Sequence, residues 1–129
     1  MIQRFIELGE GYSDLYELIE IARAQKERVK YLLALNTEID GNPVTSLAII
    51  LNPTQPGNFQ PIYFCREGIP NPNKIPNKRF DLFADLAETI EKRIIELEVK
   101  HSGAFAEKQL FFQYLIGILR MNRYLPPLS

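Results

Sequence analysis

The sequence predicts an α+β domain in the order β-α-β-β-β-α-α, with a four-stranded, mainly antiparallel sheet packed against helices. Two observations predict this class. The segment 29–66 contains alternating and apolar residues that turn residues divide into three strands, and amphipathic helical patterns flank this segment on both sides. At 129 residues the chain is expected to form a single α+β domain spanning residues 1–129.

The dipeptide Asp40-Gly41 predicts a tight hairpin between the first two strands of this segment. Both residue types accept the positive φ angles of a type I′ turn. With a two-residue loop, Ile39 faces Asn42, and the register of the whole hairpin follows. The predicted pairs are Leu35 with Ser46, Leu33 with Ala48 and Leu32 with Ile49.

Alternation along the strand before this turn predicts which side chains share a face. One face is expected to hold Val29, Tyr31, Leu33 and Leu35, and the other Lys30, Leu32, Ala34 and Asn36. The returning strand, 44–51, has small or apolar residues on both faces and no charge, which predicts the centre of the sheet. The third strand, 60–66, carries Pro61 near its start, which indicates a sheet edge or a strand beginning.

Residues 2–8 have the β-branched and aromatic content of a strand, and a glycine turn follows them. Ser13 is expected to be the N-cap of a helix over 14–26. The helix residues that follow the i, i+3, i+4, i+7 spacing are expected to face the sheet; they are Leu15, Leu18, Ile19 and Ala22.

A glycine turn that leads into a helix N-terminus is also a geometry that binds anions, because free N–H groups point at the ligand. Basic residues of the segment 66–79 could complete such a site in a small enzyme or ligand-binding protein, which requires Gly9, Gly11, Arg66 and Lys74 to share one concavity. The candidate ligand-binding residues are Gly9, Gly11, Ser13, Arg66, Lys74, Lys78 and Arg79. A tight turn with a helix cap is the favoured interpretation, since Glu10 adds negative charge.

The opening run from Met1 to Leu18, MIQRFIELGEGYSDLYEL, resembles an uncharacterised family of short cytosolic proteins of Bacillus-like bacteria. This resemblance implies a cytosolic location and assigns no chemistry to any residue.

Composition limits the cellular setting. Cys65 is the only cysteine, so no disulfide can form within the chain, which is typical of a reducing compartment. Glu7 interrupts the apolar start too early for a signal peptide, and the longest uncharged apolar-rich run, 109–119, is shorter than the ~20 residues that a membrane span needs. We therefore expect a cytoplasmic protein without a membrane partner.

A net charge of −1 argues against nucleic acid as the main partner. Nucleic-acid binding would require five cations to share one face; they are Lys74, Lys78, Arg79, Arg120 and Arg123.

The segment from Lys78 onward has the pattern of a long amphipathic helix that ends near His101-Ser102-Gly103. Its apolar stripe comprises Phe83, Leu86, Ala87, Ile90, Ile94 and Leu97. A last helix is expected over 104–124, before Pro126; one continuous kinked helix is the alternative.

The last helix is apolar around most of its circumference, which is more than one sheet contact can cover. We expect a homodimer through this helix, with Gly117 allowing close approach. The predicted interface comprises Phe111, Phe112, Leu115, Ile116 and Leu119. The alternative is a core helix between the sheet and the preceding helix. The function predicted from the sequence is therefore non-catalytic: a cytosolic dimerising protein that binds another protein or a small ligand.

No metal site or cofactor is expected. The chain has one histidine and one cysteine, too few for structural zinc. Glu98-x-x-His101 matches the spacing of di-iron helix bundles, but such sites need two copies of the motif. The acids Asp81, Asp85 and Glu88 are interpreted as a solvated helix surface.

Overall fold

The computed structural model describes residues 2–9, 12–54 and 59–126, without the side chains of Tyr12 and Ser13. The strands are β1 (Gln3–Leu8), β2 (Val29–Ile39), β3 (Asn42–Leu51), β4 (Gln60–Pro70) and β5 (Ile94–Glu98). The α-helices are α1 (Tyr12–Ala24), α2 (Lys78–Thr89) and α3 (Lys108–Met121), and the short 3-10 helices are η1 (Lys26–Arg28) and η2 (Ser102–Ala104). The α+β class is confirmed.

The sheet differs from the prediction in size and in direction. It has five strands in the order β1-β4-β3-β2-β5, where four mainly antiparallel strands were expected. The meander β2-β3-β4 is antiparallel, whereas β1 pairs in parallel with β4 and β5 pairs in parallel with β2. The sheet is therefore mixed, because each of the two edge strands, β1 and β5, pairs in parallel with an outer strand of the antiparallel meander.

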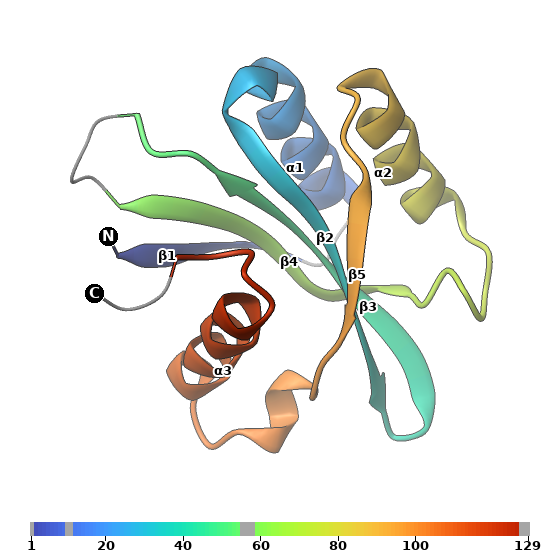
Figure 1. The fold of residues 1–129 in the computed structure, drawn as a ribbon. Coiled ribbons are helices and arrows are strands. Elements are labelled where there is room, and N and C mark those ends of the chain that lie inside the picture. The colour runs from blue at the N-terminus through green and yellow to red at the C-terminus, as the bar shows by residue number, and fades with distance from the viewer. Residues whose placement is uncertain (1, 10–11, 55–58, 127–129) are drawn as a thin grey trace.

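Helices cover both faces of the sheet (Figure 1): α1 and α2 lie on one face and α3 lies on the other. The central strand β3 supplies both cores, with Leu47 and Ile49 facing α1 and α2, and Ala48 and Ile50 facing α3. This confirms the predicted position of β3, because a strand covered on both faces must be apolar on both. None of the helices in the described ranges is long and apolar enough to cross a membrane.

The predicted hairpin register is confirmed. Ile39 pairs with Asn42, and the three predicted pairs further along the strands are present. Asp40 and Gly41 have φ angles of 51° and 81°, so both residues of the loop adopt the left-handed conformation that a type I′ turn requires.

The predicted assignment of the β2 side chains to the two faces of the sheet is correct only from Tyr31 onward. The register of β2 against β3 shifts between Val29 and Tyr31, which is a β-bulge. Val29 therefore joins the core under α1 together with Leu32, and not the opposite face with Leu33 as predicted. Strict alternation fails at this point because a bulge inserts one extra residue into the strand.

The second half of the predicted long helix is a strand. Helix α2 ends at Thr89, Glu91 has a φ angle of 58°, and residues 94–98 form β5 beside β2. Ile94 and Leu97 therefore belong to the sheet and do not continue the stripe of α2. A parallel ladder to β2, from Leu32↔Ile94 to Asn36↔Glu98, supplies hydrogen bonds that local helical periodicity does not reveal.

The other helix boundaries also shift. Helix α1 begins at Tyr12, so Ser13 lies in its first turn and does not precede it. The predicted inner face of α1 is confirmed, since Leu15, Leu18, Ile19 and Ala22 are all buried. Helix α3 begins at Lys108, four residues later than predicted, because η2 occupies Ser102–Ala104.

Strand β4 runs past its predicted end at Arg66 to Pro70. An irregularity at this point places Glu67 at a φ angle of 49°, and the Glu67 N–H donates to the Ser46 hydroxyl oxygen at 2.8 Å. The Ser46 hydroxyl thus takes the place of the backbone carbonyl that would accept this hydrogen bond in a regular antiparallel pair of strands. Residues 67–70, beyond the predicted end of this strand, therefore belong to β4.

Candidate functional site

The glycine turn borders a small cavity on the α1 and α2 face of the sheet. Gly9, Thr45, Cys65, Gly68 and Arg79 are among the residues that line it. Its volume is about 10 Å³, which is room for one water molecule. A phosphate group or a substrate therefore does not fit inside this cavity as it stands.

The Asp14 carboxylate lies beside Gly9 at the start of α1. A Cβ atom built on Gly9 would lie 2.6 Å from the Asp14 carboxylate oxygen Oδ2. A larger residue at position 9 would therefore require the Asp14 side chain to move. A negative side chain in the first turn of α1 complements the helix dipole.

The polar groups around the cavity already have partners. The Arg79 guanidinium donates to the Gly68 carbonyl oxygen at 3.1 Å, and the Thr45 hydroxyl donates to Asn36 Oδ1 at 2.6 Å. Among the side chains that the structure describes, no buried nitrogen or oxygen is without a hydrogen-bond partner. Nothing in this cavity therefore requires a bound ligand.

The Cys65 thiol is not a nucleophile at neutral pH. Burial raises its pKa to about 12, and the nearby carboxylates of Asp14 and Glu17 add to the rise. The Sγ atom lies 3.8 Å from the Asp14 carbonyl oxygen, its acceptor. A thiol in this setting remains protonated and packs as a small apolar group.

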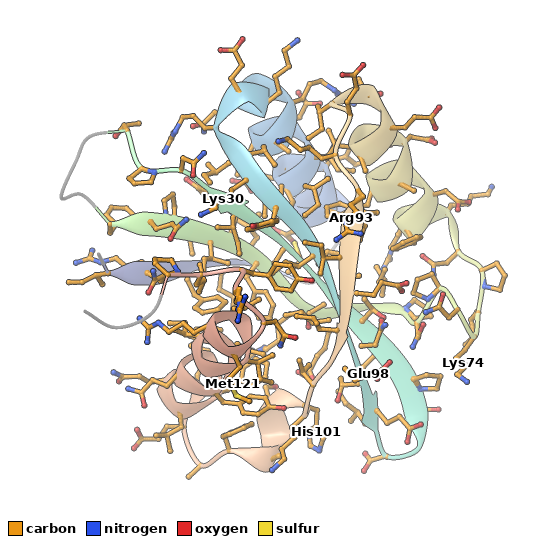
Figure 2. All side chains as sticks on the ribbon, viewed as in Figure 1. Lys30, Lys74, Arg93, Glu98, His101 and Met121 are labelled. Carbon is orange, nitrogen blue, oxygen red and sulfur yellow. The ribbon has the colours of Figure 1, made fainter. Side chains whose placement is uncertain are left out.

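Among the predicted anion-binding residues that the structure describes, only Gly9 and Arg79 line the same cavity. Arg66 lies on the α3 side of the sheet, where its Nε atom is 3.0 Å from a carboxylate oxygen of Glu7. Lys74 is in the loop between β4 and α2 (Figure 2), and Lys78 is the exposed first residue of α2. Gly11 and the side chain of Ser13 lie outside the described part of the chain. Arg66 and Lys74 were expected to share a site with Gly9, and the structure separates them because they lie on different faces and loops.

The five cations required for nucleic-acid binding are also separated. Lys74, Lys78 and Arg79 belong to the loop before α2 and to its first turn, whereas Arg120 and Arg123 belong to α3 and the turn after it, on the opposite face of the sheet. A single nucleic-acid strand along one face cannot contact both groups.

The acidic motifs do not form a metal site. Glu98 ends β5 and His101 follows it, so their spacing is not one helical turn as the di-iron pattern requires. Asp81, Asp85 and Glu88 are exposed on α2. Within residues 2–9, 12–54 and 59–126, no group of three His, Cys, Asp or Glu side chains is arranged to hold a metal ion.

The residues predicted as a dimer interface lie mainly on the inner face of α3. Phe111, Leu115 and Leu119 are buried against the sheet, and they belong to the core with Leu33 and Phe64. The partly buried members of the predicted set, Phe112 and Ile116, pack against the same core. These five residues therefore contact the chain's own sheet. The helix is not enclosed between the sheet and the preceding helix, as the alternative held, because α2 lies on the opposite face of the sheet.

Another side of α3 carries a different apolar stripe, which we call the outer stripe: Leu110, Tyr114, Gly117 and Met121. Of these, Tyr114 is partly buried and also packs against the core. Their spacing of four, three and four residues places them on one side of a helix. Leu110 is 44% exposed and Met121 is 84% exposed. Apart from its chain neighbours and the backbone of the helix itself, no atom of the described residues lies within 4 Å of the position that a Cβ atom on Gly117 would take, so the stripe is open at its centre.

The sequence did not predict a groove at the C-terminal end of α3, which we call the basic groove. It is lined by Lys30, Arg120, Met121, Arg123, Leu125 and Pro126. Its volume is about 500 Å³ and it is open to solvent. Arg120 and Arg123 belong to the five cations that the sequence suggested for nucleic-acid binding. Lys30 comes from β2, and no residue near it in the sequence indicates that it lies beside these arginines.

Comparisons with known proteins identify a family for this chain. No curated protein and no solved structure matches the chain. A family model described as a domain of unknown function (DUF7147) matches residues 1–125. The chain therefore belongs to this uncharacterised family.

Proposed function

We propose that this protein acts in the cytoplasm by binding rather than by catalysis, and that it works as a homodimer joined through the outer stripe of α3. The main observation that supports this proposal is that Leu110 and Met121 are exposed on one side of α3. Gly117 lies between them and leaves open space on the helix surface. Large apolar side chains aligned on one helix face are typical of an interaction surface.

The outer stripe is complementary to itself. In an antiparallel pair of α3 helices with a two-fold axis between Tyr114 and Gly117, Leu110 lies opposite the partner's Met121. Tyr114 then lies opposite the partner's Gly117, where no side chain obstructs the ring. Because Leu110 and Met121 are eleven positions apart, the contact would extend over about 16 Å of helix.

One contact prepares this face for a partner. The Tyr114 hydroxyl oxygen accepts a hydrogen bond from the Lys100 N–H at 2.9 Å, which holds the ring in one orientation. The tyrosine ring therefore needs little reorganisation on binding.

The experiment is size-exclusion chromatography with light scattering on the wild-type chain, Leu110→Glu and Ile75→Glu. We expect a dimer for the wild type, a folded monomer for Leu110→Glu, and a dimer for Ile75→Glu. The last variant is a matched control, because Ile75 is 49% exposed and lies in the loop before α2.

A wild-type monomer at the highest soluble concentration would overturn the proposal, as would a Leu110→Glu dimer. Circular dichroism on each variant verifies the fold. Phe112→Asp is unsuitable for this test because Phe112 packs against the chain's own sheet, so its loss would unfold the monomer.

A further inference from the structure

The basic groove is formed by two segments that are far apart in the sequence. Lys30 comes from the start of β2, and the other five lining residues come from the end of α3 and the turn that follows it. Leu125 is 3% exposed and forms the apolar base of the groove, while the flexible side chain of Met121 forms a wall. Methionine adapts to the shape of a ligand, which makes it common at binding surfaces.

The described residues provide no counter-charge for the groove. Its described lining contains three cations and no acid. The ion pairs of Arg23 with Glu20, and of Arg66 and Lys108 with Glu7, involve none of these three cations. A positive groove on a chain of net charge −1 is a local feature, and the overall composition does not account for it.

The β-bulge in β2 aims Lys30 into this groove. Regular alternation would place Lys30 on the face of Leu32, under α1. The register shift between Val29 and Tyr31 puts Val29 on that face, and Lys30 instead lines the groove beside α3. Bulges commonly redirect one side chain in this way.

The Arg120 guanidinium is held in place by the chain. Its Nε atom donates to the Pro126 carbonyl oxygen at 3.2 Å and its Nη2 atom donates to Gln3 Oε1 at 2.9 Å. A guanidinium has five N–H donors, so further donors are available to a ligand without a rearrangement of the side chain. The groove therefore presents a fixed cation together with two others.

We propose that the basic groove binds an acidic segment of another protein, whose carboxylates face Lys30, Arg120 and Arg123 and whose apolar side chain rests on Met121 and Leu125. Charge complementarity selects an anionic partner. An open groove with an apolar base suits an extended peptide that alternates acidic and apolar residues. The lining contains no aromatic ring on which a base could stack, which favours a peptide over single-stranded nucleic acid.

This inference rests on the proposal that the protein acts by binding, and it names the chemistry of a partner without requiring the dimer. The groove and the outer stripe share Met121, so Met121 is not used in either test.

The test is fluorescence anisotropy with a short dye-labelled peptide in which pairs of glutamates alternate with leucines. We expect saturable binding that weakens as salt rises, and a loss of affinity of about tenfold with Lys30→Glu and with Arg123→Glu. Lys100→Glu is the matched control: it reverses one exposed positive charge after β5, outside the groove lining, and should leave affinity unchanged. A peptide with glutamines in place of the glutamates should bind at least tenfold more weakly.

Three results would overturn the proposal: no saturable peptide binding, an equal loss with Lys100→Glu, or tighter binding of a single-stranded oligonucleotide than of the peptide. The Leu110→Glu variant separates this proposal from the dimer. If that variant is monomeric and still binds the peptide, the groove acts independently of self-association. If the wild type is monomeric and binds the peptide, only the dimer is wrong.

Discussion

The ring of Phe5 stacks on the ring of Phe112, with centroids 4.3 Å apart and planes 6° from parallel. This contact joins β1, at one edge of the sheet, to α3. Both rings also meet Phe64 of β4 edge-on, at centroid distances of 5.5 and 5.8 Å. The α3 side of the sheet is therefore held by an aromatic cluster that unites the two ends of the chain.

We predict that Phe5 and Phe112 are energetically coupled. Phe5→Leu and Phe112→Leu should each lower the free energy of unfolding by about 1 kcal/mol. The loss of unfolding free energy in the double variant should be about 1 kcal/mol smaller than the sum of the two single losses, because each single variant already lacks the stacking contact. Urea denaturation of the four proteins measures this coupling.

The control for this cycle pairs Phe5→Leu with Phe83→Leu. Phe83 is fully buried on the α2 side of the sheet, where it has no contact with the aromatic cluster. Its effect should add to that of Phe5 within about 0.5 kcal/mol. If the effects of Phe5→Leu and Phe112→Leu on the free energy of unfolding also added within about 0.5 kcal/mol, the stacking would make no measurable contribution to stability.

A second prediction concerns the turn that ends α2. Glu91 is exposed and has a φ angle of 58°. Residues with a side chain adopt this left-handed conformation at a cost of roughly 1–2 kcal/mol, whereas glycine adopts it freely. Glu91→Gly should therefore raise the free energy of unfolding by about 0.5 kcal/mol, after the entropy that glycine adds to the unfolded chain is subtracted. Thermal unfolding measures the change.

Glu88→Gly is the matched control for this turn. Glu88 is also an exposed glutamate, but it lies inside α2. The same replacement should lower stability there by about 1 kcal/mol, because glycine is a poor helix former. Destabilisation by Glu91→Gly would mean that the glutamate side chain contributes more than the strained backbone costs.

A third prediction concerns pH. Burial and the nearby carboxylates raise the pKa of the Cys65 thiol from its ordinary value of 9.0 to about 12. The neutral thiol therefore contributes stability that is complete below pH 9.0 and is lost as the pH rises toward about 12. Wild-type stability should fall more steeply than that of Cys65→Ala over this range, as urea denaturation at several pH values would show.

The same environment should protect Cys65 from alkylation. At pH 8 we expect iodoacetamide to modify the folded protein more slowly than the urea-unfolded chain by more than about tenfold, because the thiolate is the reactive species. Equal labelling rates in the two states would contradict the burial of the thiol.

Several features could be predicted from neighbouring residues alone. Asp40-Gly41 predicted the hairpin and its register, because a two-residue loop with two left-handed residues allows only one pairing. The start of α2 was predictable for a similar reason: the Asn77 side chain accepts a hydrogen bond from the Phe80 N–H, within one turn.

The segment 94–98 shows where local patterns fail. Ile94 and Leu97 have helical spacing after Phe83 and Leu86, yet this segment is a strand paired with β2. The partner strand is about sixty residues away in the sequence, so no local pattern identifies it. The same limit explains why the predicted anion site did not assemble, since Arg66 and Gly9 are near each other along paired strands but face opposite sides of the sheet.

The sequence by itself determined the turn at Asp40-Gly41, the cap at the start of α2 and the apolar character of β3, because these depend on interactions within a few residues. Only the tertiary structure decided which residues are exposed and which share a surface. Phe111 is buried while Leu110 is exposed, because α3 presents its inner side to the sheet. Lys30 joins Arg123 at one groove, because a bulge and a long-range contact bring β2 beside the end of α3. Packing between distant segments therefore positions both proposed binding surfaces, and the free energy of that packing cannot be read from either segment alone.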